Sequence, residues 1–324
     1  MKKNNFLLLF SIIIFNFKIA NANDDFEKWK INFKIYAVEK GVSSITLNQL
    51  IDKSKFLPDV IKYDRYQPEF YEDTKTYISK RASKKKVLIG NKIYKNNIDK
   101  INFISTKYNV DKNLLLSLMG IETNFGNYLG KMDIISSLAT LSFDKRRSEF
   151  FTSELITLLK LIDNNIIDPK TLYGSWAGAF GNFQFMPSTI KNYAIDFDKD
   201  KKISLKKTED SFASAANYLN KLGWNNSTPC FYKIKLNSTI PEDYLNVSAK
   251  KIHSTKKVKY LKKYIHESDY LNIHDDLFAA IITPDAEIVE NPNKLYPAFI
   301  IFDNYKLILK WNRSLRFALA VCTL

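Results

Sequence analysis

One carboxylate near the end of an apolar run is the group of this chain best placed to do chemistry. Glu122 lies within residues 120–126 (GIETNFG), seven residues after Leu115, four after Leu118 and three after Met119. On a helix, this spacing puts the carboxylate on the same face as three apolar side chains. Apolar surroundings and the carbonyl end of a helix both disfavour the charged form. The pattern therefore predicts a general acid, which must hold its proton near neutral pH.

The helix that must position this carboxylate has recognisable ends. Asp111 is of a residue type that caps helix N-termini, and Gly126 is a natural stop. Glu122 is then expected in the last turn of the helix. From this segment alone an alternative stays open, in which a helix-end glutamate simply reaches into solvent.

The first 22 residues have the layout of a secretory signal peptide. Two lysines follow Met1, residues 6–17 are apolar, and residues 20–22 (ANA) form a small-x-small cleavage pattern. Cleavage is expected after Ala22, with an uncleaved anchor as the alternative. No later segment is long and apolar enough to predict a transmembrane helix. The mature protein is therefore expected to be exported, which in a Gram-negative cell means the periplasm.

Composition narrows the choice of partner. The 324 residues suffice for a sizeable core and two or three subdomains, and the net charge of +15 indicates an anionic partner. Export argues against nucleic acid and favours a cell-wall polymer or an anionic surface. Cys230 and Cys322 are the only cysteines. A disulfide between them and two unpaired thiols both remain open.

Hydrophobic periodicity predicts helices through most of the chain and strands toward its end. Helices are expected over residues 24–38, 47–51, 71–79, 110–123, 148–163, 210–223, 255–265 and 314–321. Strands are expected over residues 231–236, 277–282, 298–302 and 307–311.

Taken together, several segments resemble the lytic murein transglycosylase B family. They are residues 64–70 (DRYQPEF), 120–126, 139–144 (ATLSFD), Arg146-Arg147 with 149–151 (EFF), 174–187 (GSWAGAFGNFQFMP), 216–219 (ANYL) with Gly223-Trp224, and 304–312 (NYKLILKWN). Any one of these motifs is modest evidence, but their order and spacing together are specific. The resemblance spans nearly all of the chain after the signal peptide.

The resemblance implies a mainly α (α+β) fold with a lysozyme-like catalytic core. The helical N-terminal part would be residues 23–97, the core with an EF-hand-like loop 98–228, and a small β-containing C-terminal part 229–324, which returns to the core. The implied enzyme cleaves the β-1,4 bond between N-acetylmuramic acid and N-acetylglucosamine without water, leaving a 1,6-anhydromuramyl end. Glu122 matches the family's single acid/base. A hydrolytic muramidase and an inactive peptidoglycan-binding scaffold are the alternatives.

The resemblance also assigns binding roles. Ser175 and Gln184 would hydrogen-bond the glycan or orient the glutamate, Tyr77 and Tyr218 would be cleft aromatics, Asn312 a cleft amide, and Arg146 and Arg147 would face carboxylates of the peptide stem. Trp311 and Phe317 stand where the family often has tyrosines, so stacking is kept but a hydroxyl donor is lost. Helix packing for the tyrosines and a solvated helix start for the arginines are the alternatives. The implied partners are peptidoglycan strands and other cell-wall enzymes.

A calcium loop is the remaining candidate site. Starting at Asp196, acids occupy positions one, three and five, and a lysine at seven offers its backbone carbonyl. Position twelve lacks the usual glutamate, but the family resembled has a longer loop closed by an aspartate at fifteen. The ligands would be Asp196, Asp198, Asp200, Lys202 and Asp210. Lys201 departs from the glycine usual at the sharp turn. Such calcium would be structural, since the implied chemistry needs no cofactor; an Asp-rich turn is the alternative.

Overall fold

The computed structural model describes residues 23–66, 72–270, 273–288 and 293–324 of the chain. The predicted signal peptide and the QPEF part of the motif at residues 64–70 lie outside the described residues. Within them the fold is mainly α-helical with small sheets, as expected. No helix in these ranges is long and apolar enough to cross a membrane.

The chain forms two compact units that share its sequence in alternating stretches. The first unit contains residues up to 66, 129–192 and 199–204, and the second contains 67–128, 193–198 and 205–324. The division into four consecutive parts at residues 22, 97 and 228 stays a prediction.

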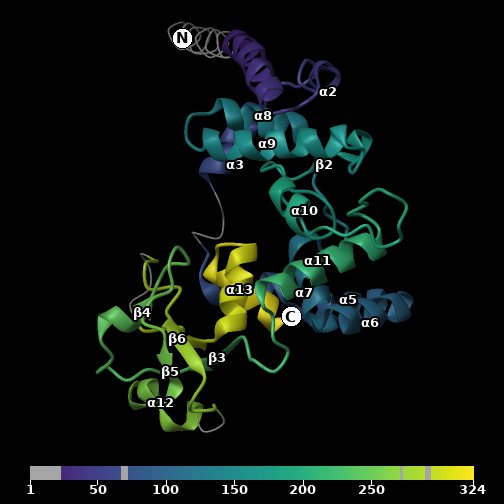
Figure 1. The fold of residues 1–324 in the computed structure, drawn as a ribbon. Helices are drawn as coiled ribbons and strands as arrows, with labels where there is room; N and C mark the ends of the chain where they lie inside the picture. Colours follow the sequence, from purple (N-terminus) through teal and green to yellow (C-terminus); the bar gives the residue numbers. More distant parts are fainter. Residues whose placement is uncertain (1–22, 67–71, 271–272, 289–292) are drawn as a thin grey trace, which may run out of the picture. The chain divides into compact units, whose positions relative to one another are not determined.

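The first unit has its core between two antiparallel helices. A helix over residues 23–39 is followed by α2 (Ser44–Leu50), α3 (Pro58–Arg65), α8 (Ile134–Phe143), α9 (Ser148–Asp163) and α10 (Pro187–Tyr193). Figure 1 shows α8 and α9 side by side. Leu138 of α8 and Leu155 and Leu158 of α9 are fully buried, so these two helices supply the apolar centre of this unit.

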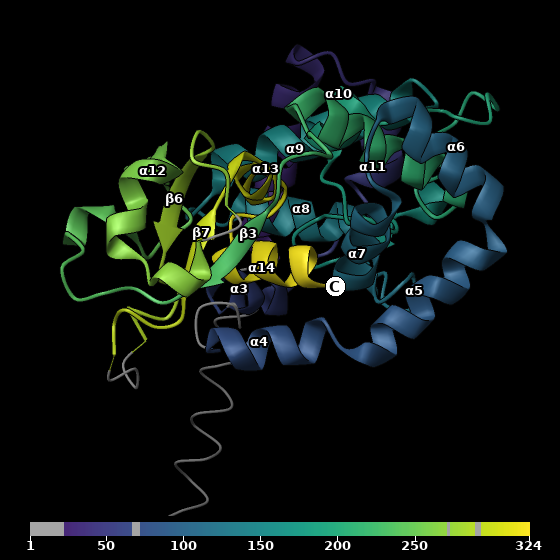
Figure 2. The same cartoon turned by 90° about the horizontal axis from the view of Figure 1, so that it is seen from below.

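The second unit contains α7 (Lys112–Thr123) together with several other helices. They are α4 (Thr74–Arg81), α5 (Lys84–Asn96), α6 (Ile98–Tyr108), α11 (Thr208–Leu222), α13 (Asp303–Trp311) and α14 (Leu315–Thr323). Helix α7 contacts α5, α6, α11 and α14, and Figure 2 shows it among them. Leu115 and Leu118 have no exposed surface. The helix that carries Glu122 is therefore largely enclosed by its neighbours.

Both ends of α7 follow from side-chain and backbone chemistry. The Asp111 carboxylate accepts the backbone N–H of Asn113 at 2.6 Å, as an N-cap does. The helix ends at Thr123 because Asn124, with a φ of 48°, starts a left-handed turn that reaches Gly126. The stop thus comes two residues before the expected glycine, and Glu122 lies in the last turn as predicted.

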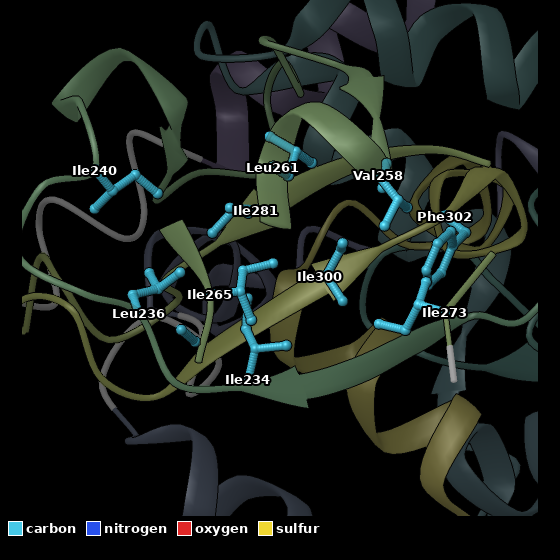
Figure 3. Packing of buried hydrophobic residues seen from close by; sticks show 12 residues of the cluster. Ile234, Leu236, Ile240, Val258, Leu261, Ile265, Ile273, Ile281, Ile300 and Phe302 are labelled. Carbon is cyan, nitrogen blue, oxygen red and sulfur yellow. The ribbon is translucent and has the colours of Figure 1, made fainter. Parts of the chain in front are cut away.

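The second unit also contains the β part of the molecule. Its strands are β3 (Phe231–Ile234), β4 (Leu245–Asn246), β5 (Lys256–Lys257), β6 (Phe278–Ile282) and β7 (Ala298–Ile301), in the order β3-β7-β6-β4 with β5 beside β6. The pair β4–β6 is parallel and the other pairs are antiparallel. Val258 and Leu261 of α12 (Val258–Leu261) pack with Ile281 and Ile300 in one buried cluster (Figure 3).

Short elements complete the description. In the first unit β1 (Met132–Asp133) pairs with β2 (Tyr173–Gly174), and a 3-10 turn, η2, spans Pro169–Thr171. In the β part the 3-10 turns are η3 (Glu242–Tyr244), η4 (Lys262–Tyr264) and η5 (Glu267–Asp269).

Two secondary-structure predictions for the end of the chain are wrong. Residues 307–311 belong to helix α13 and not to a strand, since a short apolar run has no period that separates the two. Residues 255–265 do not form one helix. They contain the short strand β5, a single helical turn (α12) and a 3-10 turn (η4). Pairing of β5 with β6 replaces the first expected turn of that helix.

The two cysteines form a disulfide. Cys230, just before β3, is bonded to Cys322 in the last turn of α14, with their Cα atoms 6.2 Å apart. The N–H of Phe302, just after β7, donates to the carbonyl of Cys230 at 2.9 Å. The β part therefore enters and leaves the helical part of its unit at one place.

Candidate active site

Glu122 meets the C-terminal part of the chain through a hydrogen bond. The indole Nε1–H of Trp311, at the end of α13, donates to Glu122 Oε1 at 3.1 Å. The glutamate is half-buried in the last turn of α7, above the buried Leu118 and Met119 of the same face. The carboxylate is thus held at a fixed place by a neutral donor and remains within reach of a ligand.

A row of aromatic rings supports the indole. Tyr218 of α11 lies with its ring centroid 5.0 Å from that of Trp311 and 4.4 Å from that of Tyr193. Its hydroxyl donates to the carbonyl of Lys310 at 3.3 Å. Burial raises the pKa of the Tyr218 phenol to about 12, and Tyr193 adds to the rise. Tyr218 therefore stays neutral at physiological pH and fixes the end of α13.

A lysine contacts the C-terminal end of α7, the helix that carries Glu122. Lys86 of α5 donates from Nζ to the carbonyl of Gly120 at 2.7 Å. Burial lowers the pKa of this ammonium group, and the charge of Arg81 lowers it further. A cation at the carbonyl end of a helix is favourable, so Lys86 stabilises the turn that presents Glu122.

Two further predicted residues of the second unit have well-defined surroundings. Tyr77 of α4 is buried, and the guanidinium carbon of Arg81 lies 3.7 Å from its ring centroid. Asn312 caps α13, where its backbone N–H donates to Ile308 and its carbonyl accepts from Ser314. Their roles toward a glycan stay predictions.

Ser175 lies in a tight loop of the first unit. Its N–H donates to the carbonyl of Ala179 at 2.8 Å, and its hydroxyl accepts the N–H of Ala179 at 3.1 Å. A Cβ on the preceding Gly174 would lie 2.3 Å from that same carbonyl oxygen. The small residues of this block therefore allow the close backbone approach that holds Ser175, as the sequence indicated.

Gln184 is fixed in the same loop by its own amide. Its Nε2 donates to the carbonyls of Gly181 at 3.0 Å and Leu129 at 3.3 Å. Its φ of 49° is a conformation that non-glycine residues seldom adopt. A side chain anchored in this way presents its amide group at a fixed place.

The predicted pair of arginines contacts an acid of its own unit. Arg146 donates from Nε to Asp64 Oδ2 at 2.7 Å, and an Nη of Arg147 contacts Asp64 Oδ1. The Asp64 side chain is 1% exposed, whereas the two arginine side chains are 46% and 38% exposed. Their inner faces thus neutralise a buried carboxylate. A role toward stem peptides, which would use their outer faces, stays a prediction.

Three of the five predicted calcium ligands come together in the second unit. Carboxylate oxygens of Asp196, Asp198 and Asp210 all lie within 4.8 Å of one another. Asp210, at the start of α11, is buried and accepts the N–H of Phe197 at 2.8 Å. Lys207 lies 3.0 Å from Asp198. An oxygen cluster of this kind suits a hard cation such as calcium.

The loop backbone tolerates the departure from glycine. Lys201 has a φ of 69°, in the left-handed region that the sharp turn requires. Asp200, in the first unit, accepts the N–H of Lys202 at 2.9 Å, as the third acid of such a loop does in closing its turn. The turn thus keeps the conformation of such a loop, although a lysine at this φ costs more conformational energy than a glycine would.

Sequence reasoning missed three contacts that shape these sites. They are the indole bond to Glu122, the stacking of Tyr193 on Tyr218, and the burial of Asp64 under two arginines. The family resemblance placed Trp311 and Asp64 in motifs, which was the available signal. Nothing in the spacing pointed to Tyr193.

Comparison with known proteins agrees with this geometry. Membrane-bound lytic murein transglycosylase B of Escherichia coli is 42% identical over 127 residues, which are 39% of this chain and 35% of that protein. The chain thus matches about a third of the length of this relative.

Solved structures match over most of the chain. SltB3 from Pseudomonas aeruginosa, in complex with NAG-anhNAM-pentapeptide, superposes with a TM-score of 0.79 at 28% identity, covering 91% of this chain and 77% of that one. The Escherichia coli lytic transglycosylase Slt35 in complex with calcium gives 0.71 at 27% identity, with 90% and 89% covered. The model of the transglycosylase SLT domain matches residues 25–324. The chain therefore belongs to this family of lytic transglycosylases and has its lysozyme-like fold.

Proposed function

We propose that this protein is an exported lytic transglycosylase that cleaves the β-1,4 bond between N-acetylmuramic acid and N-acetylglucosamine in peptidoglycan. The observation that carries the proposal is Glu122, half-buried at the end of α7 and held by the indole N–H of Trp311. The family supports the reaction class, and a relative solved with NAG-anhNAM-pentapeptide supports the product. We further infer that residues 1–22 direct export and are removed after Ala22.

The reaction needs one acid/base. Glu122 gives its proton to the glycosidic oxygen, and the bond from that oxygen to the anomeric carbon breaks. The resulting carboxylate then takes the proton of the muramyl 6-hydroxyl, whose oxygen bonds to the anomeric carbon and closes the 1,6-anhydro ring. The proton count balances and Glu122 ends protonated. Hydrolytic glycosidases need a second carboxylate for water or for a covalent intermediate, and an internal nucleophile removes that need.

Trp311 orients this carboxyl group. An indole N–H only donates, so it fixes Oε1 as an acceptor. The acid proton is then carried by Oε2, which becomes the oxygen that faces the glycosidic bond. Tyr218 keeps the indole in place through its ring and through its bond to Lys310.

The remaining site residues take supporting roles in the proposal. Ser175 and Gln184 present polar groups to the glycan, and Tyr77, Tyr218 and Asn312 belong to the cleft that receives it. The outer N–H groups of Arg146 and Arg147 face stem carboxylates, while their inner groups stay on Asp64.

Calcium, where bound, would be held by Asp196, Asp198 and Asp210. Its role would be to fix the loop before α11, the helix that carries Tyr218. A relative solved with calcium supports this assignment. Every chemical step above uses only the chain's own residues and the substrate.

Product analysis is the decisive experiment. Purified peptidoglycan digested with the mature protein should yield muropeptides with 1,6-anhydro ends, which are lighter than hydrolytic products by one water molecule in mass spectrometry. Hydrated products alone would establish a muramidase. Tight binding without any cleavage would establish a binding scaffold instead.

A further inference from the structure

A cluster of positive charge lies beside the candidate active site, in the second unit. A cavity of about 440 Å³ is lined by the basic residues Lys250, Lys251, Lys306, Lys310 and Arg313 together with Trp311. We call it the cationic pocket. None of its described lining residues is acidic. Its volume is in the range of pockets that hold small ligands.

Most of these charges lack a partner that would explain them structurally. Among the described residues, Lys250, Lys251, Lys310 and Arg313 form no ion pair, and all four are exposed. Lys306 contacts Asp303 at 3.1 Å and Thr255 at 3.2 Å. Like charges gathered around one cavity repel each other, so they cost stability unless an anion is bound between them.

Two separate elements supply the charges. Lys306 and Lys310 lie one turn apart on α13, and Lys250 and Lys251 lie on the loop that follows β4. The pocket is thus built where the β part faces α13, and it is not a run of lysines along a single helix. A charged face of one solvated helix does not account for it.

The pocket adjoins the reacting group. Trp311 lines it and also donates to Glu122. An occupant of the pocket therefore lies one side chain away from the carboxylate. The five cations therefore lie close enough to meet a neighbouring group of a substrate held at Glu122.

We infer that the cationic pocket binds the carboxylates of the peptide stem carried by the muramyl residue being cleaved; this inference rests on the proposed function. A peptide stem ends in a carboxylate, and ammonium and guanidinium groups are its natural partners. The pocket would give the enzyme a preference for peptide-bearing strands over bare glycan. Nothing in the acid/base step at Glu122 requires it.

The test compares two substrates that differ only in their peptides. Glycan strands with stems, and the same strands stripped of stems by an amidase, are digested by the mature protein and by Lys250→Gln/Lys251→Gln. Removing two exposed charge contacts should lower kcat/KM on peptide-bearing strands about tenfold. On stripped strands the change should stay under about twofold, since Glu122 is untouched.

The matched control removes two exposed lysines elsewhere. Lys92→Gln/Lys95→Gln on α5 makes the same change in net charge outside the pocket. It should leave both rates near those of the unaltered protein. A tenfold loss in this control too would mean that overall charge, and not the pocket, sets the preference, and the inference would fail.

Other outcomes are equally decisive. An equal loss of Lys250→Gln/Lys251→Gln on both substrates, or no loss on either, overturns the inference. So does a result in which the variant digests both substrates normally but no longer binds vesicles of anionic lipid, which would assign the pocket to a membrane surface.

Binding separates this inference from the proposed function. Calorimetry with a disaccharide-pentapeptide and with the bare disaccharide needs no turnover. If the protein proves inactive, a preference for the peptide-bearing ligand that Lys250→Gln/Lys251→Gln removes still supports the pocket. Equal affinities of the unaltered protein for the two ligands would contradict the inference.

Discussion

Asp64 in the first unit and Glu122 in the second each lie in the last turn of a helix, yet their surroundings differ. Asp64 is nearly inaccessible and meets two guanidinium groups, while Glu122 is half-buried and accepts a bond from a neutral indole. Two ion pairs anchor a buried carboxylate in the structure, whereas a single neutral donor orients a carboxyl group and leaves it within reach of a ligand. The contrast separates an acid that stabilises the packing of its unit from an acid that is placed to act on a ligand.

The strongest test of this contrast replaces Glu122, the proposed acid/base. Glu122→Gln keeps the shape and the indole contact but cannot carry the proton, so the rate of strand cleavage should fall by about 10³-fold or more. Thermal unfolding should shift little, and binding of glycan fragments should persist. Full activity in this variant would refute the assignment of Glu122.

Replacing the buried acid should produce the opposite result. Asp64→Asn leaves two arginines without their carboxylate, and the loss should be about 2 kcal/mol of unfolding free energy, below the full cost of a buried pair because the guanidinium groups are partly exposed. The kcat at low temperature should be retained. Denaturant unfolding measures the free energy of unfolding, and the rate of product formation measures kcat.

A matched control uses the same substitution at a more exposed pair. Asp144→Asn removes only the contact with Arg65, whose side chain is 55% exposed. Its cost should stay below about 1 kcal/mol. Equal destabilisation by the two variants would show that Asp64 is not a special structural acid.

The neutral donor can be removed by itself. Trp311→Phe keeps the ring beside Tyr218 but deletes the N–H, so kcat should drop about tenfold through loss of carboxyl orientation. Trp224→Phe deletes a comparable indole bond, to Asn226, and should leave the rate unchanged. If both variants behave alike, the bond to Glu122 has no role in the chemistry.

The smallest expected effect concerns a third group of acids, the candidate calcium ligands Asp196, Asp198 and Asp210. Calcium at five times its Kd should stabilise the fold by about 1 kcal/mol, or a few degrees in Tm, if Asp196, Asp198 and Asp210 bind it. The Asp198→Asn variant should lose this shift. A melting curve that is the same with chelator and with calcium would count against the site.

The parts of the fold that depend on near neighbours in sequence were predictable. The cap at Asp111, the bounds of α9 and the end of α11 at Gly223 follow from periodicity and capping residues. The prediction of a strand over residues 307–311 is wrong because this short run, with four apolar residues, fits both periods. Local patterns of this kind fix an element only when it is long enough to show its period.

Contacts between distant residues were beyond reach of the pattern. Trp311 and Glu122 are 189 residues apart, and Arg146 and Asp64 are 82 apart. Which side chains meet is decided by how helices pack, and packing depends on shape across the whole core. The same applies to the disulfide, for which the sequence left two outcomes open.

The junction at Cys230 and Phe302 has a consequence for how such a protein can diversify. The strands β3 and β7 pair along their length, so the β part is closed at its base like a large loop. The entropic cost of closing a loop rises only slowly with its length. Insertions and deletions between these two residues should therefore change the stability of the helices around Glu122 only slightly. Lys250 and Lys251 lie in this exchangeable segment, so substrate preference can evolve there while the cleaving group stays unchanged.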